Sequence, residues 1–272
     1  MFSDDKLFHQ FALKGGNALN LVYKLGSRSS VDVDLSLEND FGDIEDARDR
    51  IFRSLKSRFA EAGIVVFDEK FIKRPPEPKD REESWGGYQI EFKLMDEDKY
   101  FPMSVDPNRM RREAIVTGPG EKRIFTIQIS KYEYCRGKVE TEFQNYSIFV
   151  YTPSMIAIEK LRAICQQMDE YPLRRYATPR ARDFYDIHSI VTGAGVDFGI
   201  VESIELARNI FAAKNVDYSL IDNIEKYREF HRQDWPAVEL TVADQVQEFD
   251  FYFSFVIEQA TLLKPLWEKQ TP

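Results

Sequence analysis

Apolar and polar residues alternate strictly over a short segment near the start of the chain, residues 31–37. In a β-strand, side chains two residues apart lie on the same face of the sheet. The alternation therefore predicts a strand with one face toward a core and one face outward: Val31, Val33, Leu35 and Leu37 on the first, and Asp32, Asp34 and Ser36 on the second. Two carboxylates would stand side by side on the polar face.

Helical periods flank this strand. Residues 17–26 predict a helix that follows a turn at Gly15 and Gly16 and ends at Gly26. Its inward residues would be Leu21, Val22 and Leu25. Apolar residues recur at helical spacing again from Ile44 to Ala62, before Gly63. Short strands are predicted at residues 11–14 and 64–71, so the order along this part of the chain is β-α-β-α-β.

The chain changes character near residue 151. Between residues 73 and 87, prolines and charged residues predict an exposed loop. Further strands are predicted at residues 88–95, 124–130 and 146–152, with a long irregular stretch between the first two. Thr152 and Pro153 are typical of an N-cap and a first helical residue, and the period stays helical almost to the end. We therefore expect an α+β domain over residues 1–151 and an all-α domain over residues 152–272.

Composition and charge narrow the class of protein. The 272 residues carry a formal net charge of −9, which argues against a protein coated in basic surface. Basic residues do cluster locally, at residues 109–113 and 173–182. The two cysteines, Cys135 and Cys165, give no disulfide framework, and the three scattered histidines have no zinc spacing. A reducing, cytoplasmic setting is expected.

No membrane segment is expected either. The first residues lack the basic region and the long apolar region of a signal peptide. The most apolar late stretch, residues 249–263, contains Asp250 and Glu258 and is too short to span a bilayer. It predicts a buried helix.

The paired aspartates are the main candidate for chemistry. Carboxylates one strand-step apart hold oxygen ligands at a separation suited to hard divalent cations such as Mg²⁺. A glycine pair between a strand and a helix leaves backbone N–H groups open to phosphate. Asp32 and Asp34 could also be an ordinary solvated strand face, and Gly15 and Gly16 an ordinary tight turn. Together, however, the two features predict a site that binds phosphate and holds its metal.

Four blocks of sequence carry a resemblance to a known family: "LKGGNAL" (13–19), "SRSSVDVDLSL" (27–37), "MIAIEKLRAI" (155–164) and "RARDFYDI" (180–187). With these blocks in this order, the chain resembles the nucleotidyltransferase toxins of the AbiEii/AbiGii type, within the polymerase-β-like nucleotidyltransferase superfamily. The resemblance extends from about Phe11 to Ile190. It implies an α+β fold, with a nucleotidyltransferase-type mixed sheet flanked by helices and followed by an all-α helical bundle.

The resemblance implies roles for the residues around the aspartate pair. Gly15 and Gly16 would bind the phosphates of a nucleotide, and Asn17 stands where many members have Ser or Thr. Asp32 and Asp34 would hold Mg²⁺ or Mn²⁺ and align the attacking hydroxyl with the α-phosphorus.

The resemblance also implies roles outside this pair. Arg28 and Ser30 match the family's R-x-S and would support the nucleotide-binding loop. The helical domain would supply a lysine that reaches nucleotide phosphate, a catalytic aspartate and two supporting residues: Lys160, Asp183, Arg182 and Asp186. Lys160 and Asp183 would thereby contribute to the cleft.

These helical residues also have structural explanations. The apolar residues around Lys160 do not fit one stripe, which places the lysine close to buried surface, yet a solvated lysine is equally compatible with the period. Asp183 and Asp186 lie three residues apart near a helix start. Acidic residues there also complement the helix dipole and cap free N–H groups.

One expected carboxylate is missing. Many superfamily members carry a third acidic residue on a neighbouring strand, and the family pattern places it within residues 124–130, where this chain has Gln128. A neutral amide is a poor substitute for a metal-binding carboxylate. Glu91, which shares a strand face with Gln89 and Lys93, is the nearest alternative metal ligand, or else an ordinary solvated residue.

The resemblance implies a Mg²⁺-dependent nucleotidyltransferase that transfers a nucleoside monophosphate from an NTP to a hydroxyl acceptor. The acceptor would be RNA, such as tRNA, or a protein. The enzyme would be the toxin of a toxin–antitoxin or phage-defence system, with a cognate antitoxin. The arginines between Arg174 and Arg182 could receive an RNA backbone. Two alternatives stay open: a catalytically impaired nucleotide-binding or interaction protein on the same fold, because of Gln128, and a globular protein whose aspartates are merely surface.

Overall fold

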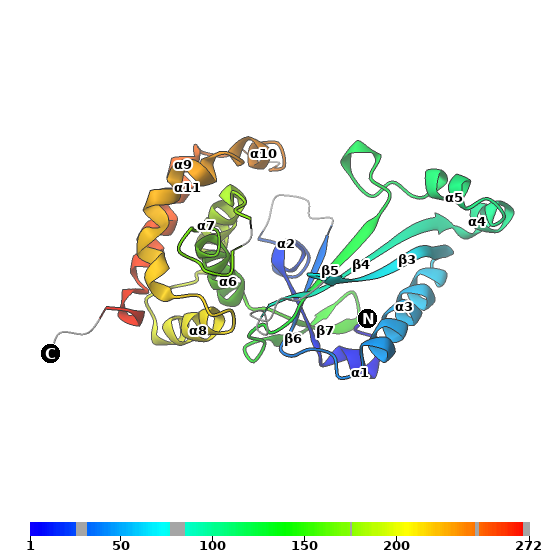
Figure 1. Cartoon of the computed structure of the whole chain (residues 1–272), viewed down its shortest axis with the longest axis horizontal. Helices are drawn as coiled ribbons and strands as arrows, with labels where there is room; N and C mark the ends of the chain where they lie inside the picture. Colours follow the sequence, from blue (N-terminus) through cyan, green and yellow to red (C-terminus); the bar gives the residue numbers. More distant parts are fainter. Residues whose placement is uncertain (26–31, 77–84, 175, 243–244, 269–272) are drawn as a thin grey trace. The chain divides into compact units, whose positions relative to one another are not determined.

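The computed structural model describes residues 1–25, 32–76, 85–174, 176–242 and 245–268. The chain divides into two compact units (Figure 1). The sheet unit comprises Met1–Asn17, Ser30–Cys135 and Glu140–Val150. The helical unit comprises Ala18–Ser29, Arg136–Val139 and Tyr151–Pro272.

A seven-stranded mixed sheet is the framework of the sheet unit. Its strands, in spatial order, are β3 (Ile64–Arg74), β4 (Gly87–Asp96), β5 (Phe125–Ser130), β2 (Val33–Leu37), β1 (Phe11–Lys14), β7 (Tyr146–Val150) and β6 (Val139–Phe143). Strand β2 is the central one, antiparallel to β1 and parallel to β5. Its apolar face is buried as predicted, with Leu35 and Leu37 only 1% and 2% exposed. This mixed sheet, followed from Pro153 onward by helices, confirms the α+β fold class.

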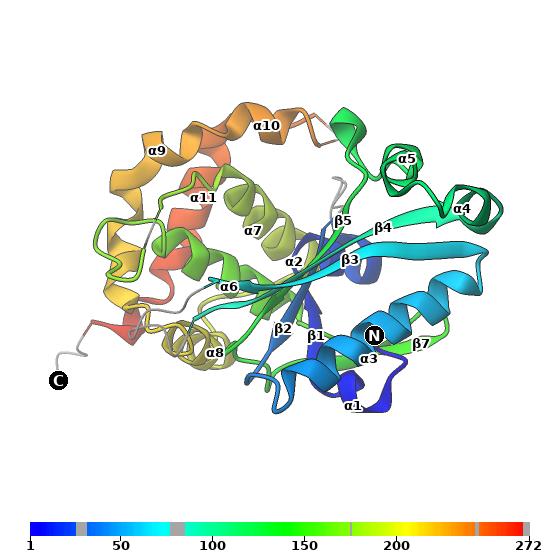
Figure 2. The same cartoon turned by 45° about the vertical axis from the view of Figure 1, so that its right-hand side comes forward.

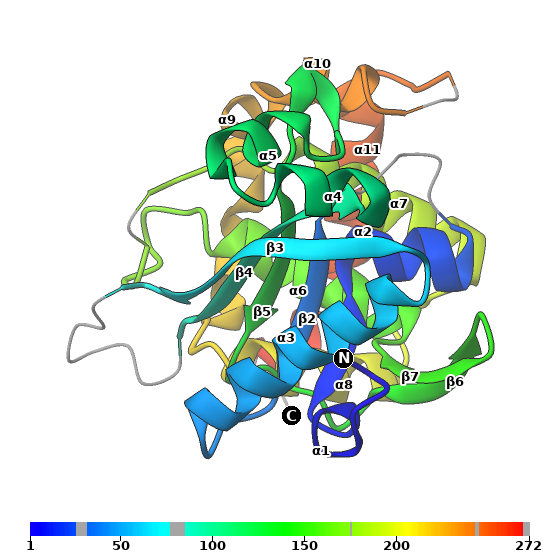
Figure 3. The same cartoon turned by 90° about the vertical axis from the view of Figure 1, so that its right-hand side faces the viewer.

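The sheet unit also contains these helices: α1 (Asp5–Phe8), α3 (Ile44–Ala60), α4 (Glu97–Met103) and α5 (Pro107–Glu113). Helix α3 begins where the Asp43 side chain accepts hydrogen bonds from the N–H groups of Glu45 and Asp46. It packs against β3 (Figure 2). Helices α4 and α5 pack at the end of the β3–β4 pair (Figure 3).

The stretch between β4 and β5 was wrongly predicted to be irregular, because it contains α4 and α5. Each is only seven residues long, which leaves too few positions for a visible helical period. The start of α5 did carry a signal that was overlooked. Asp106 accepts a hydrogen bond from the N–H of Arg109 at 3.0 Å, and Pro107 is the first helical residue. Strand β6 was also missed, although Val139, Thr141 and Phe143 alternate along it with Glu140 and Glu142.

The helix predicted after β1 begins directly at Gly15, whose positive φ of +66° turns the chain out of the strand. A short α-helix, α2 (Gly15–Asn17), continues as a π-helix at Ala18–Tyr23. A π-helix has a different repeat from an α-helix, so the buried positions shift to Ala18 and Leu19. The predicted inward placement of Leu21 was therefore wrong, since it is 47% exposed.

The polar face of β2 is open at one end only. Ser36 was expected to face outward, but Ser36 and its register partner Ala12 on β1 are fully buried. The face is therefore covered at the Ser36 end, whereas Asp32 and Asp34 are partly exposed at the other end. Gly26 and Val31, which were expected to end the preceding helix and begin this strand, lie outside the described residues.

The helical unit contains these further helices: α6 (Pro153–Cys165), α7 (Ala181–Ala194), α8 (Val201–Ala212), α9 (Arg228–Arg232), α10 (Trp235–Glu239) and α11 (Phe249–Thr261), with 3₁₀ turns at Tyr218–Tyr227 and Lys264–Leu266. Helix α6 packs against α7 and α8, and α11 packs against α7. The predicted start of α6 is confirmed, because Oγ1 of Thr152 accepts a hydrogen bond from the N–H of Met155 at 3.3 Å.

The late apolar segment is helix α11, and its inner face is buried as predicted. Phe253 of α11 stacks on Phe184 of α7, with ring centroids 4.9 Å apart. Both rings are fully buried. Among the described residues, no helix has both the length and the apolar character needed to cross a membrane.

Candidate functional site

The aspartate pair lies at the open end of β2. Asp34 is opposite Lys14 on β1 and Gln128 on β5. Directly opposite residues share one face of a sheet, so these three side chains extend from the same face. Asp32 immediately precedes β2, and its side chain is 41% exposed. Two partly exposed carboxylates therefore lie at the start of the central strand, Asp34 within it and Asp32 just before it.

Gly15 packs directly against the carboxylate of Asp34. Its φ of +66° lies in the left-handed region that favours glycine. A Cβ built on Gly15 would lie 2.6 Å from Oδ2 of Asp34, which is closer than a carbon and an oxygen can approach. Only glycine therefore lets the chain pass from β1 into α2 this close to the carboxylate.

Asn17 ties the first helical turn to the start of β2. Its Nδ2 donates a hydrogen bond to the backbone carbonyl oxygen of Asp32 at 2.8 Å. Asn17 is only 7% exposed. The side chain assigned to phosphate by the resemblance thus holds the backbone of a candidate metal ligand in place.

Lys122 forms an ion pair with Asp32 that was not predicted from the sequence. Its Nζ lies 3.2 Å from Oδ1 of Asp32. Lys122 shortly precedes β5, and because β5 is parallel to β2, both strands begin at the same edge of the sheet. The sequence carries only a weak indication of this contact. Lys122 lies in the loop "GPGEKR", and only the parallel pairing of β5 with β2 brings this loop close to Asp32.

The structure does not bring Glu91 to the aspartate pair. Glu91 lies on β4, which β5 separates from β2, so the two strands are about 10 Å apart. Its carboxylate accepts a hydrogen bond from Gln89 at 2.7 Å and pairs with Lys70 at 3.4 Å. Gln128 stands between them, exposed and directly opposite Asp34. Within the described part of the chain, no three acidic, histidine or cysteine side chains gather as a metal site.

Asp32 and Asp34 nevertheless fit a hard divalent cation. Mg²⁺ is usually held through one or two carboxylates together with water and substrate phosphates, rather than in a full protein cage. Both aspartates are partly exposed, so water and phosphate oxygens can reach them. The missing Cβ of Gly15 leaves room for the Asp34 carboxylate. A third protein carboxylate is not required for such a site.

Lys160 lies in a buried ion cluster within the helical unit. Its Nζ is 2.8 Å from Oδ1 of Asp183 and 2.7 Å from Oδ2 of Asp186. The three side chains are at most 12% exposed. Burial acts to lower the pKa of Lys160, but the neighbouring carboxylates of Asp183 and Asp186 outweigh it and raise the pKa, so the lysine is charged. The structure thus brings three of the predicted residues together.

Other side chains hold the start of helix α7. Oδ1 of Asp234 accepts a hydrogen bond from the N–H of Ala181 at 2.9 Å, and Nδ1 of His231 accepts one from the N–H of Arg180 at 3.1 Å. Burial lowers the pKa of His231 to about 4, so this histidine is neutral near pH 7. Arg182 is exposed on the same helix. Arg28 and Ser30 lie outside the described residues.

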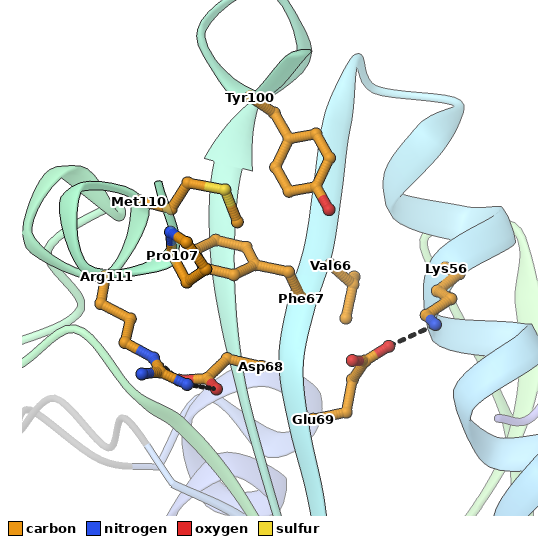
Figure 4. Close-up of a pocket in the computed structure, with 9 residues that line it drawn as sticks. All are labelled: Lys56, Val66, Phe67, Asp68, Glu69, Tyr100, Pro107, Met110 and Arg111. Carbon is orange, nitrogen blue, oxygen red and sulfur yellow. Dashed lines mark hydrogen bonds and ion pairs between the residues drawn. The ribbon is translucent and has the colours of Figure 1, made fainter. Parts of the chain in front are cut away.

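A cavity of about 240 Å³ lies elsewhere in the sheet unit, between α3, β3 and the α4–α5 segment (Figure 4). Its wall combines apolar and aromatic side chains with two ion pairs: Phe67, Tyr100 and Met110, with Asp68–Arg111 and Lys56–Glu69. The guanidinium of Arg111 beside Asp68 lowers the pKa of that carboxyl. Strand β3 is at the edge of the sheet, three strands from β2, so this cavity is separate from the aspartate pair.

Comparison with known proteins finds a matching family model and similar solved structures. Residues 1–254 match the family model described as nucleotidyl transferase AbiEii toxin, type IV toxin–antitoxin system. No curated protein sequence matches the chain. A crystal structure of a candidate nucleotidyltransferase from H. pylori is similar at 17% identity and a TM-score of 0.45, over 94% of this chain and 88% of that one. An antigenic nucleotidyltransferase-like protein from Paracoccidioides brasiliensis is similar at 14% identity and a TM-score of 0.37, over 81% and 87%.

Proposed function

Because this chain belongs to the AbiEii family of nucleotidyl transferase toxins, we propose that it transfers a nucleoside monophosphate from an NTP to a hydroxyl acceptor. We propose that Asp32 and Asp34 form the active site for this reaction. The family itself establishes a nucleotidyltransferase of a toxin–antitoxin system, and this confirms the resemblance seen in the sequence. The divalent metal, the residues and the acceptor are the proposed part.

One observation carries the proposal: the approach of Gly15 to the Asp34 carboxylate at the open end of a central strand. A solvated strand face needs no glycine beside it. Here the chain adopts a left-handed conformation at Gly15 and packs its backbone against a carboxylate that is partly exposed. This close approach supports a site in which the backbone at Gly15 binds phosphate and the Asp34 carboxylate binds the metal.

The residues of the sheet unit would divide the work as follows. Asp32 and Asp34 hold the metal, while the backbone at Gly15 and Gly16 approaches the triphosphate. Asn17 keeps the backbone of Asp32 in position through its hydrogen bond. The bound Mg²⁺ or Mn²⁺ stabilises negative charge on the phosphates during transfer. From the resemblance we add that Lys160 neutralises triphosphate charge, with Asp183 and Asp186 holding its ammonium group.

RNA is the acceptor that we propose first, with tRNA as the leading case and a protein hydroxyl as the other outcome. The net charge of −9 limits extended RNA contact to a local basic segment, for which exposed Arg182 is a candidate. The type IV toxin–antitoxin assignment also implies a cognate antitoxin.

The test incubates purified protein with Mg²⁺, each of four α-labelled NTPs and total bacterial RNA. Asp32→Ala/Asp34→Ala is the inactive variant. Asp49→Ala/Asp98→Ala is the matched control, because it removes two exposed carboxylates elsewhere in the sheet unit. We expect label on RNA or on protein with the wild type and the control, and none with the Asp32/Asp34 variant.

A second readout separates a missing acceptor from an inactive site. Thermal stabilisation by NTP and Mg²⁺ without any label would favour the alternative of a nucleotide-binding protein impaired by Gln128. Absence of both label and stabilisation in the wild type would contradict a nucleotide site at the aspartate pair. Equal labelling by the wild type and the Asp32/Asp34 variant would place the chemistry elsewhere.

A further inference from the structure

We propose that Lys122, which pairs with Asp32, is a triphosphate-binding residue that leaves Asp32 when the aspartate pair takes up a metal together with polyphosphate. This inference rests on the proposed function, because it assigns a further residue to the same site. It starts from the ion pair of 3.2 Å between Nζ of Lys122 and Oδ1 of Asp32.

The loop that carries Lys122 is closed by its own hydrogen bonds. The backbone N–H and the Oγ1 of Thr117 both donate to the carbonyl oxygen of Lys122, at 2.6 and 3.0 Å. The next residue, Arg123, donates to the carbonyl oxygen of Ala114. These bonds fix the backbone of Lys122 near the start of β5, at the sheet edge where β2 also starts. Its ammonium group can therefore swing on its side chain, but it stays close to the aspartate pair.

The ion pair is exposed, and this makes it easy to exchange. The Lys122 and Asp32 side chains are 43% and 41% exposed, and such pairs contribute little net free energy. When the two carboxylates take up a divalent cation, Lys122 loses its partner and its ammonium group is repelled by the new positive charge. The neighbouring carboxylate, Glu121, is a weak alternative partner for Lys122, because it is 85% exposed and already lies 4.0 Å from Arg123. A polyphosphate arriving with the metal offers Lys122 a stronger partner, because hydrogen bonds between ammonium and phosphate are charge-assisted.

This exchange predicts opposite effects on two ligands. Lys122 competes with the metal when the metal binds alone, and it assists binding when the metal arrives with polyphosphate. A lysine that only stabilised the loop would affect both ligands in the same direction. With the exchange that we propose, the site favours a metal–nucleotide complex over a free metal ion.

The experiment measures two binding affinities: that of Mn²⁺ alone, by electron paramagnetic resonance, and that of the Mn²⁺–tripolyphosphate complex, by calorimetry. Tripolyphosphate replaces NTP because it carries no base. The proteins are the wild type, Lys122→Gln, Lys122→Arg, Asp32→Ala and Lys6→Gln. Lys6 is the matched control, since it also forms an exposed ion pair: its Nζ lies 3.6 Å from Asp46 and its side chain is 64% exposed. It lies in α1, near the end of β1 that pairs with Leu37 and not near the end that pairs with Asp34.

For Lys122→Gln we expect Mn²⁺ alone to bind about threefold to fivefold more tightly. We expect the tripolyphosphate complex to bind about tenfold more weakly. Lys122→Arg keeps the charge and should restore most of the tripolyphosphate affinity, and Lys6→Gln should change neither.

Unchanged binding of both ligands in Lys122→Gln, or a change in the same direction, would overturn the inference while leaving the proposed function intact. Wild-type protein that binds no Mn²⁺, or binds it as well after Asp32→Ala, would instead overturn the proposed metal site and this inference with it. The two failures are therefore distinguishable.

Discussion

Replacement of Gly15 by alanine tests the geometry on which the site depends. Gly63 provides the matched control in the same unit. Both glycines have a similar positive φ, +66° for Gly15 and +70° for Gly63. A Cβ on Gly15 would lie 2.6 Å from Oδ2 of Asp34, whereas a Cβ on Gly63 would meet nothing within 4 Å. The difference between the two variants therefore isolates the contact with Asp34.

The expected magnitudes follow from this comparison. An alanine in the left-handed region costs roughly 1–2 kcal/mol, and both variants should lose this much free energy of unfolding. Gly15→Ala must also displace the Asp34 carboxylate from its preferred rotamer, which adds roughly 0.5–1.5 kcal/mol. Because a misplaced ligand can slow a reaction about 100-fold, Gly15→Ala should also lose most of its transfer activity. Gly63→Ala should keep that activity.

The assay is a double-mutant cycle in urea. Gly15→Ala is combined with Asp34→Ala, which removes the clashing oxygen, and with Asp34→Asn, which keeps an atom in its place. We expect a coupling free energy of about 1 kcal/mol with Asp34→Ala and a much smaller one with Asp34→Asn. Equal destabilisation by Gly15→Ala and Gly63→Ala, with no coupling to Asp34, would refute the contact and the argument built on it.

Three further predictions concern stability, pH and metal affinity. Lys160→Met should lower the free energy of unfolding by roughly 3–5 kcal/mol in urea titrations, because it removes the ammonium group that the buried carboxylates of Asp183 and Asp186 share and leaves Asp183 with the more exposed Arg180 at 3.4 Å; adding Asp183→Asn and Asp186→Asn should recover most of the loss. His231 has a pKa of about 4 in the folded protein against an ordinary value of 6.5, so the unfolded state binds more protons between these values. Stability should then fall as the pH falls from about 6.5 to about 4, by up to about 3 kcal/mol, and urea titrations of His231→Gln should lack this part of the pH dependence. Gln128→Glu should tighten Mn²⁺ binding roughly tenfold in a calorimetric titration, because it adds a carboxylate beside the paired aspartates; unchanged affinity would contradict the register that we describe.

The parity of residues along β2 was enough to place Asp34 on its polar face, because a strand alternates whatever surrounds it, whereas Asp32 precedes the strand. Parity could not show how much of that face is open. Ser36 shares the face with the aspartates and is nevertheless fully buried. Its burial comes from the rest of the fold, which a local pattern does not encode.

Residues that meet through strand register were the hardest to foresee. Lys122 contacts Asp32 although 90 positions separate them, and only the parallel pairing of β2 with β5 brings them together. The same pairing places Gln128 opposite Asp34 and leaves Glu91 one strand further away. Sequence spacing alone made Glu91 a reasonable ligand candidate, because nothing in it gives the order of strands.

The family resemblance singled out Lys160, Asp183 and Asp186, but it did not predict that they pair with one another, and the residue pattern alone favoured a capping role for the two aspartates. Acidic residues near a helix start usually cap it, yet Asp234 and His231 hold the start of α7, while Asp183 and Asp186 bind Lys160. The capping residues come from a later segment of the chain, so no local signal could identify them.

The most direct test of the central claim is a crystal structure with Mn²⁺ and a non-hydrolysable NTP, using anomalous scattering to locate the metal. We predict a metal peak within about 2.0–2.6 Å of carboxylate oxygens from both Asp32 and Asp34, with the triphosphate against the backbone at Gly15. A metal peak that contacts neither aspartate, or a triphosphate bound away from Gly15, would contradict the account.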